Sequence, residues 1–239
     1  MRFYCPQPLI SHSEIDLPAE VANHLVRVLR SEVGTRFFLF NGEGGMHEAE
    51  LTEAGKKNAR ARLLDFHAED RQSPLLTHLG QVMSKGDRMD YAIQKATEMG
   101  VTEITPLTSE RCELRLRGEE RADKKLEHWR RVAISACEQC GRNIPPLIHE
   151  PMALSDWLKH AQADLKLVLA PAVSGSLPAQ APASVALLIG PEGGLSEAEI
   201  QQATQTGFLP WQLGPRVLRT ETAPVAALAV LQSRFADLA

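Results

Sequence analysis

The sequence predicts an α/β protein in which helices cover both faces of a mostly parallel sheet, with a small β-barrel before it. From residue 75 onward, apolar segments of strand length alternate with segments that repeat apolar residues every three to four positions. Before that point, short β-type runs recur and are separated by turn signals. A polar stretch that ends in proline, residues 69–74, lies between the two parts. We therefore expect two domains, residues 1–72 and residues 73–239.

The composition is that of an ordinary globular protein and gives no overall sign of a nucleic-acid partner. Hydrophobic residues make up 44% of the 239 residues, charged residues make up 23%, and the formal net charge is −4. No apolar run approaches the roughly 20 residues of a membrane span, and the N-terminal residues lack the apolar core of a signal peptide. Four cysteines in a chain of this length do not make a disulfide framework. We therefore expect a cytoplasmic protein, in which local basic patches matter more than net charge.

The first domain contains runs with the composition of strands, at residues 35–40, 46–51 and 59–64. Glycine-rich turns separate these runs. One short helix is expected over residues 20–29, where apolar side chains recur on a single face. Closing five or six such short strands into a small β-barrel is the economical way to bury them.

The second domain alternates strands with helices. In chain order the expected elements are a strand at 76–83, a helix at 88–99, a strand at 101–107, a helix at 119–140, a helix at 154–160 and a strand at 165–170. A loop rich in Pro, Ala and Ser follows at residues 174–182, and we expect it to be exposed. Because strands that alternate with helices usually run parallel, this pattern predicts a sheet with helices on both faces.

Two strand-loop-helix units complete the chain. The first, VALLIGPEGGLSEAEI at 185–200, breaks at GPEGG, whose glycines allow backbone groups to approach a ligand closely. Ser196 and Glu199 predict a capping box at the start of the helix behind it. In the second unit, LGPRVLRTETAPVAALAVL at 213–231, Pro224 suits the first turn of the last helix. Loops at the carboxyl ends of neighbouring parallel strands predict a ligand crevice, although GPEGG alone could be a simple tight turn.

Several common chemistries find no support in the sequence. Cys137 and Cys140 form a CxxC pair, but at the C-terminal end of a predicted helix, where the dipole does not favour a thiolate, and no second pair completes a zinc site. We therefore interpret the pair as structural or incidental. The eight histidines lack metal-site spacing, so no metal is expected, and neither a dinucleotide fingerprint nor a P-loop occurs.

Basic residues at the predicted crevice point to a larger anionic substrate. Lys85, Arg88, Arg216 and Arg219 all follow strands whose carboxyl ends should meet at one edge of the sheet. In the plain alternative these charges form a solvated face. Residues 219–222, RTET, are likewise open to two interpretations: a threonine that caps the last helix, or an Arg–Glu pair that faces the crevice and is used there.

These same segments resemble a known family. QVMSKGDRMDYAIQKATEMGV, SERC, CEQCGR, LLIGPEGGLSEAEI and LGPRVLRTETA follow one another as in the small-subunit ribosomal RNA uridine-N3 methyltransferases of the SPOUT class. HLVRVLR at 24–30 is similar to the PUA-like RNA-binding barrel of that family, so the resemblance spans nearly the whole chain. A minor departure is the Pro-Val pair at 224–225.

The resemblance implies a deep trefoil knot at the C-terminus, a homodimer, and methylation of N3 of a uridine in 16S rRNA of the small ribosomal subunit. It also implies that S-adenosylmethionine is bound by the loops after three strands. The residues implied for the cofactor are Leu169, Ala170, Pro171, Ile189, Gly190, Pro191, Glu192, Gly193, Leu213, Gly214, Val217 and Leu218.

Residue chemistry suggests roles for the remaining charged groups. Uridine N3 must lose a proton, so we hypothesise that Arg219 stabilises the anionic uracil and that Glu192 or Glu221 orients the site or accepts the proton. Residues expected to hold RNA phosphates are Arg27, Arg30, Lys85, Arg88, Arg111 and Arg142. The alternatives are a SPOUT methyltransferase for another RNA position, a non-catalytic RNA-binding assembly factor, and a metabolic α/β enzyme for a small anion.

Overall fold

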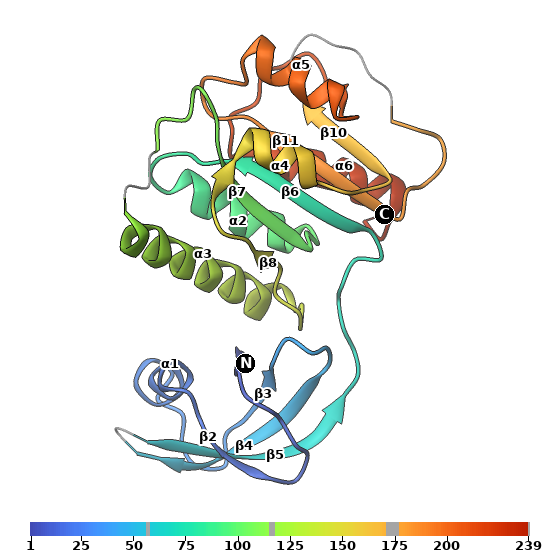
Figure 1. The fold of residues 1–239 in the computed structure, drawn as a ribbon. Helices are drawn as coiled ribbons and strands as arrows, with labels where there is room; N and C mark the ends of the chain where they lie inside the picture. The colour runs from blue at the N-terminus through green and yellow to red at the C-terminus, as the bar shows by residue number, and fades with distance from the viewer. Residues whose placement is uncertain (56–57, 115–117, 171–176, 239) are drawn as a thin grey trace. The chain divides into compact units, whose positions relative to one another are not determined.

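The computed structural model describes residues 1–55, 58–114, 118–170 and 177–238 (Figure 1). The chain forms two compact units, one of Met1–Gln72 with Cys137–Pro145 and one of Ser73–Ala136 with Pro146–Ala239. The first break, between residues 72 and 73, lies in the polar stretch noted in the sequence. The two domains expected from the sequence, with a single boundary at 72/73, placed residues 137–145 in the second domain. The contacts of these residues place them in the first unit.

The first unit contains a five-stranded sheet. Its strands are β1 (Arg2–Tyr4), β2 (Glu14–Asp16), β3 (Arg36–Phe40), β4 (Met46–Ala54) and β5 (Ala59–His67). They pair in the order β1-β3-β4-β5-β2, and among the described residues no pairing of β1 with β2 closes the sheet into the expected ring. In β4, buried and partly exposed residues alternate along most of the strand, because successive side chains of a strand point to opposite faces.

The expected helix of the first unit is present in a modified form. It begins as α1 (Ala19–Asn23) and continues as a π-helical turn, η1 (His24–Val28). Leu25 is fully buried against the sheet side chains Phe3, Phe37 and Leu39, which form the core of this unit. Burial of this apolar face explains why the segment stays helical although it is short.

Residues 137–145 are joined to the first unit by hydrogen bonds. Arg2 donates to the Gly141 carbonyl at 2.8 Å, and the Tyr4 backbone N–H donates to Glu138 at 2.9 Å. The Cys137 thiol is buried, and its hydrogen bond with Cys140 together with burial raises its pKa well above the usual range. A thiol that resists ionisation is a poor nucleophile, which agrees with a structural interpretation of the CxxC pair.

The second unit is built on a seven-stranded sheet whose pairings are all parallel, as the sequence pattern predicted. The strands are β6 (Leu76–Val82), β7 (Glu103–Thr108), β8 (Leu147–Ile148), β9 (Met152–Ala153), β10 (Leu165–Leu169), β11 (Ser184–Ile189) and β12 (Leu209–Trp211). Their order is β12-β10-β11-β6-β7-β8, with β9 also beside β7. β12 is a three-residue strand and ends before Gln212, earlier than the sequence suggested, so the following loop is longer.

The helices of this unit are α2 (Arg88–Glu98), α3 (Glu119–Cys140), α4 (Leu154–His160), α5 (Glu197–Gln205) and α6 (Thr222–Phe235). The last turn of α3, from Cys137 onward, belongs to the first unit. α2 packs with α6, and α4 packs with α5. Ser196 and Glu199 form the predicted capping box of α5. The N-cap of α6 is Glu221, which makes no side-chain cap bond, so the threonine caps considered for this helix are wrong.

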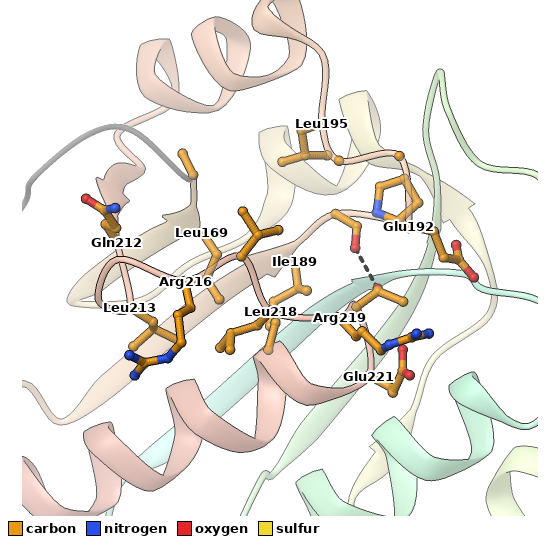
Figure 2. A pocket seen from close by; sticks show the side chains of 18 of the residues that line it. Leu169, Ile189, Glu192, Leu195, Gln212, Leu213, Arg216, Leu218, Arg219 and Glu221 are labelled. Carbon is orange, nitrogen blue, oxygen red and sulfur yellow. Dashed lines mark hydrogen bonds between the residues drawn. The ribbon is translucent and has the colours of Figure 1, made fainter.

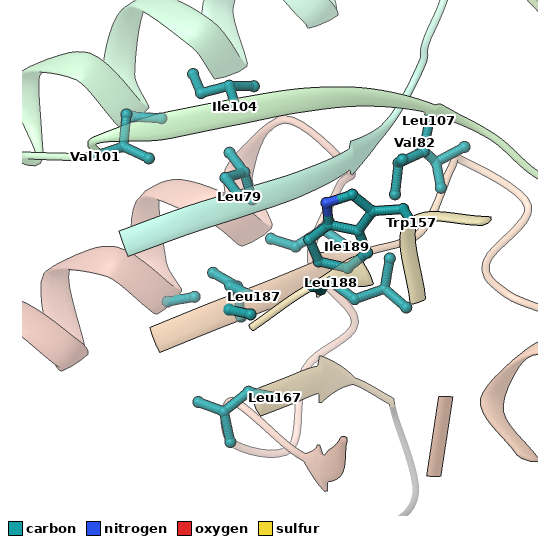
Figure 3. Packing of buried hydrophobic residues seen from close by; sticks show 14 of the residues in the cluster. Leu79, Val82, Val101, Ile104, Leu107, Trp157, Leu167, Leu187, Leu188 and Ile189 are labelled. Carbon is teal, nitrogen blue, oxygen red and sulfur yellow. The ribbon is translucent and has the colours of Figure 1, made fainter. Parts of the chain in front are cut away.

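Trp157 of α4 lies at the centre of the core, against the sheet (Figure 3). An added Cβ at Gly80 of β6 would lie 2.6 Å from its ring, so the close approach of α4 to the sheet requires glycine there. The core around Trp157 contains Leu79, Val82 and Leu107 from the central strands (Figure 3). Within the described residues, no helix combines the length and apolar character that crossing a bilayer would require.

Candidate functional site

A pocket of about 670 Å³ lies at the carboxyl ends of β10, β11 and β12 (Figure 2). Residues that follow these three strands and the first turn of α6 line it. This position agrees with the crevice expected from the two loops, and the volume lies in the range of small-molecule sites.

The walls of the pocket are mainly apolar. Leu169 from β10, Ile189 from β11, and Leu213 and Leu218 from the loop before α6 point into it from different sides (Figure 2). Apolar walls combined with nearby backbone amides and carbonyls are suited to a flat aromatic group with polar edges.

The GPEGG segment forms a tight turn that contributes one wall. The Gly194 N–H donates to the Pro191 carbonyl at 2.9 Å, and Gly194 has a φ of +69°, which favours glycine. A Cβ on Gly190 would lie 2.9 Å from Leu195 Cγ and 3.0 Å from its backbone nitrogen. The segment is therefore both the tight turn of the plain interpretation and a wall of the pocket.

The structure brings together eleven of the twelve residues expected to bind a cofactor, since all but Pro171 line this pocket. Pro171 lies outside the described residues. Apart from the residues expected to bind RNA or to act in catalysis, the lining residues missing from the expected cofactor set are Glu113, Gly194, Leu195, Ile200, Trp211, Gln212, Pro215, Arg216, Thr220 and Ala223, of which Arg216 was expected at this edge as a cation. Leu195 and Ile200 could have been found from the motif that contains GPEGG, whereas Trp211 and Gln212 were missed because β12 ends earlier than expected.

Two cations that line the pocket, Arg88 and Arg111, and Lys85, which pairs with the lining residue Glu113, are engaged by the protein itself. Arg88 contacts Glu192 at 2.6 Å, and this hydrogen bond raises the pKa of the exposed Arg88 guanidinium. Lys85 contacts Glu113 at 2.7 Å, which lowers the pKa of that carboxyl. Arg111 donates to the Gly193 carbonyl at 3.0 Å. These contacts are exposed, so an anionic ligand could replace them at low cost.

Arg219 and Glu221 lie at the end of the pocket near Glu192 (Figure 2). Arg219 is exposed, and within the described part of the chain no hydrogen bond or ion pair engages its guanidinium. Glu221 is partly buried, and its Oε2 atom is buried without a hydrogen-bond partner among the described residues. A buried carboxylate oxygen without a donor is costly, so it is available to accept a proton or a donor group from a ligand.

Two candidates for phosphate binding, Arg27 and Arg30, lie in the first unit and are exposed. Arg30 has a φ of +52° in the turn after η1. Arg142 is only 3% exposed, and its guanidinium donates to Gln72 at 2.7 Å and 3.1 Å. The expectation that Arg142 holds RNA phosphate is therefore wrong, because its charge is used inside the first unit.

A second groove, of about 970 Å³, runs beside α6. Its lining includes Ala226, Ala229 and Val230 of α6 together with Leu213 and Gly214 of the preceding loop. Apolar side chains of α6 thus face this groove as well as the core.

Among the described residues, one cluster could hold a metal ion by its geometry: the potential ligand atoms of His78, Glu103 and His149 lie within 4.8 Å of one another. His149 Nε2 lies 2.7 Å from Glu103 Oε2, and His78 Nδ1 lies 4.0 Å from the same atom. Trp157 donates to His78 Nε2 at 3.2 Å, so the neutral ring carries its proton on Nδ1, and burial lowers the pKa of His78 to about 4. Metal binding through Nδ1 would break this arrangement, so we interpret the cluster as a hydrogen-bonded group.

Comparison with known proteins gives consistent matches along the chain. The model of the RNA methyltransferase domain matches residues 71–232, and the model of the RNA methyltransferase PUA domain matches residues 17–64. Similar relatives include the ribosomal RNA small subunit methyltransferase E of Buchnera aphidicola (strain Sg), 38% identical over 99% of this chain and 97% of the relative. The Bacillus subtilis protein of the same name is 31% identical over 90% of this chain and 88% of its own.

Solved structures agree over the whole chain. A Legionella pneumophila protein described as a methyltransferase, solved with the cofactor SAM bound, has a TM-score of 0.95 at 43% identity and covers 99% of this chain and 98% of its own. A ribosomal RNA small subunit methyltransferase E from Neisseria gonorrhoeae bound to S-adenosylmethionine has a TM-score of 0.92 at 39% identity, with coverage of 100% and 99%.

Proposed function

The chain belongs to the family of the ribosomal RNA small subunit methyltransferases E, and on this premise we propose that it transfers a methyl group from S-adenosylmethionine to N3 of a uridine in 16S rRNA. The observation that carries the proposal is the pocket at the carboxyl ends of β10, β11 and β12. There, apolar walls meet the guanidinium of Arg219 and the buried Oε2 of Glu221, neither of which has a hydrogen-bond partner among the described residues.

The pocket residues fit S-adenosylmethionine. Leu169, Ile189, Leu213 and Leu218 provide apolar surface for the adenine. The carbonyls of Gly190, Pro191 and Gly193 each accept one hydrogen bond from the protein, and a carbonyl oxygen has a second lone pair to offer to the polar edges of the adenine. The unpartnered oxygen of Glu221 adds negative potential to a site for a positively charged sulfonium. When bound, the cofactor supplies an electrophilic methyl group.

Uridine N3 becomes a good nucleophile only after it loses its proton. Glu221 is proposed to accept that proton, because none of the residues that the structure describes donates a hydrogen bond to its buried Oε2. Glu192 is the weaker candidate, since its carboxylate is held by Arg88 at 2.6 Å. Arg219 would stabilise the negative charge that spreads over the uracil ring as the proton leaves, and the lone pair on N3 would then bond to the methyl group as the methyl–sulfur bond of the cofactor breaks. Because N3 lies in the pairing edge of the base, the uridine must enter unpaired.

Lys85, Arg88 and Arg111 are proposed to hold the phosphates that flank the uridine. Each would exchange a protein acceptor, such as Glu113 or Glu192, for a phosphate oxygen. On the first unit, the exposed Arg27 and Arg30 are proposed to hold phosphates of the same rRNA. The match of this unit to an RNA methyltransferase PUA domain supports that assignment.

We also propose that the C-terminal part of the second unit forms the trefoil knot of the SPOUT class. Support comes from the path of the chain: β12 lies at the edge beyond β10, whereas the following helix, α6, packs with α2, which connects β6 to β7. The loop between β12 and α6 therefore returns past the carboxyl end of β11, where Thr220 reaches the Gly190 carbonyl at 2.8 Å.

The apolar groove beside α6 supports the proposal that the protein is a homodimer. A second copy that covered Ala226, Ala229 and Val230 would also close over Leu213 and Gly214, next to the cofactor loop. A ribosomal substrate further implies that the protein acts in the cytoplasm.

The test combines cells and purified protein. Mass spectrometry of 16S rRNA nucleosides should show loss of one N3-methyluridine in cells that lack the gene, with its return when the gene is restored. An unchanged N3-methyluridine content with loss of a different methylated nucleoside would indicate another RNA position. Calorimetry that found no binding of S-adenosylmethionine would instead favour a non-catalytic RNA-binding factor.

A further inference from the structure

A buried chain of hydrogen bonds connects β6, the glycine-rich loop and the loop before α6. Gln81 Nε2 donates to Thr220 Oγ1 at 3.1 Å, and the Thr220 hydroxyl donates to the Gly190 carbonyl oxygen at 2.8 Å. Gln81 is 1% exposed and Thr220 is 6% exposed, so water competes little for these groups. Hydrogen bonds in such a dry setting are stronger and more directional than exposed ones.

The connection lies at the centre of the proposed catalytic segment. Thr220 stands between Arg219 and Glu221, so fixing its side chain fixes the backbone from which both charged side chains extend. On the following side, the Arg219 carbonyl accepts from the Thr222 and Ala223 N–H groups at 3.0 Å and 2.9 Å, which begins α6. The segment is thus held by the helix at one end and by the Thr220 hydroxyl in its middle.

Gln81 is a polar residue that lowers the stability of the buried strand in which it lies. Its Nε2 also donates to the Val82 carbonyl at 3.1 Å, but its Oε1 is buried and has no hydrogen-bond partner in the described part of the chain. An unpaired buried carbonyl oxygen lowers the stability of the fold, and an apolar side chain of similar size would avoid that loss. Gln81 therefore lowers the stability of the fold, and its side-chain contact outside β6 is with Thr220.

We propose that Gln81 and Thr220 are positioning residues, which hold Arg219 and Glu221 in register with the glycine-rich wall of the pocket. This inference rests on the proposed methyl transfer. It adds that Arg219 and Glu221, which act on the uridine, are aligned with the glycine-rich loop, which binds the cofactor. Because small misplacements of reacting groups cost large factors in rate, the hydroxyl of Thr220 should matter more for turnover than for cofactor binding.

The decisive variant is Thr220→Val, which keeps the shape of the side chain and removes the hydroxyl. We expect kcat for methylation of small ribosomal subunits to fall about 10- to 100-fold, while the Kd for S-adenosylmethionine changes by less than about threefold. Thr220→Ser, which restores the hydroxyl, should recover most of the rate. Thr222→Val is the matched control, because Thr222 is exposed and its hydroxyl has no hydrogen bond within the described part of the chain.

Gln81→Met gives a readout that a merely structural role would not move. We expect its Tm to equal or exceed that of the wild type, because the unpaired oxygen is gone, while its kcat falls as in Thr220→Val. If Thr220→Val does not fold, the Tm and kcat of Gln81→Met still test the proposal.

Three results would overturn the inference while the proposed function stands: a kcat within about twofold of wild type in both variants, a rate loss explained entirely by weaker cofactor binding, or parallel losses of Tm and kcat in Gln81→Met. A wild-type protein that neither binds S-adenosylmethionine nor methylates rRNA would overturn the proposed function, and this inference with it.

Discussion

Replacing Glu221 by Gln tests the proton acceptor most directly. The substitution keeps the size of the side chain but replaces its carboxylate with an amide that cannot act as a base at neutral pH. Positioned general bases contribute about 10²- to 10⁴-fold to rate, which corresponds to about 3–5 kcal/mol of barrier. We therefore expect the rate constant for methyl transfer to fall by about two to four orders of magnitude.

The same substitution should leave the fold intact. Glu221 Oε2 is buried and has no hydrogen-bond partner among the described residues, so a neutral amide removes a desolvated charge without breaking a bond within them. We expect the free energy of unfolding to fall by no more than about 0.5 kcal/mol, and it should rise if the charge is strained. Loss of activity without loss of stability separates a catalytic carboxylate from a structural one.

Glu192→Gln is the comparison variant. Glu192 pairs with Arg88 through side chains that are 31% and 41% exposed, and because solvent screens such exposed pairs, they contribute little. Its rate constant should therefore change by about fivefold at most. Both variants are to be measured in single-turnover transfer of labelled methyl groups to small ribosomal subunits, with cofactor affinity measured separately by calorimetry. Glu221 is not the proton acceptor if Glu192→Gln is the slower enzyme, or if the rate constant of Glu221→Gln stays within about tenfold of wild type.

Three further predictions concern RNA binding, the glycine-rich loop and acid stability. Replacing Lys85 and Arg111 together by Gln should weaken rRNA binding and reduce the slope of log Kd against log salt by about 2; an unchanged slope in filter-binding titrations would exclude phosphate contacts. Gly190→Ala should weaken S-adenosylmethionine binding by about 1–3 kcal/mol, because its Cβ would lie 2.9 Å from Leu195 Cγ. Gly194→Ala places its Cβ within 4 Å of no other atom, so it should weaken binding less in the same calorimetry and lower the Tm through its φ of +69°. The folded state holds the pKa of His78 at about 4, below the unfolded value of 6.5, so the unfolded chain binds more protons between these values. Stability should therefore fall as the pH drops from about 6.5 toward 4, and urea unfolding of His78→Asn should lose that part of the pH dependence.

Local sequence patterns were sufficient to predict the helices and strands and the location of the pocket. The bounds of α3 and α4 match the predicted ranges, because apolar periodicity and helix-ending residues act within a few positions. The capping box of α5 was predictable for the same reason, since Ser196 and Glu199 lie three residues apart. The parallel sheet followed from alternating strands and helices, and that topology brings the two C-terminal loops to one edge.

The partners of charged and polar side chains could not be predicted from the sequence. Arg142 looked like a surface cation, yet its guanidinium is buried against Gln72, 70 residues away. Arg88 was expected to face an anionic ligand and is held by Glu192, 104 residues away. Periodicity reports which side of an element is buried, but it does not report which distant polar group meets a side chain there.

The sequence by itself therefore determined that this is a two-part α/β protein with a ligand crevice formed by GPEGG and LGPRVLRTETA, because hydrophobic period and turn chemistry are local properties. Only the tertiary structure decided which partners the polar and charged side chains of that crevice have. It engaged Glu192 with Arg88, left Glu221 Oε2 without a partner among the described residues, and turned Thr220 from a possible helix cap into a link to Gly190. Gln81, which completes that link, lies 139 residues before Thr220, and only the folded sheet brings the two together.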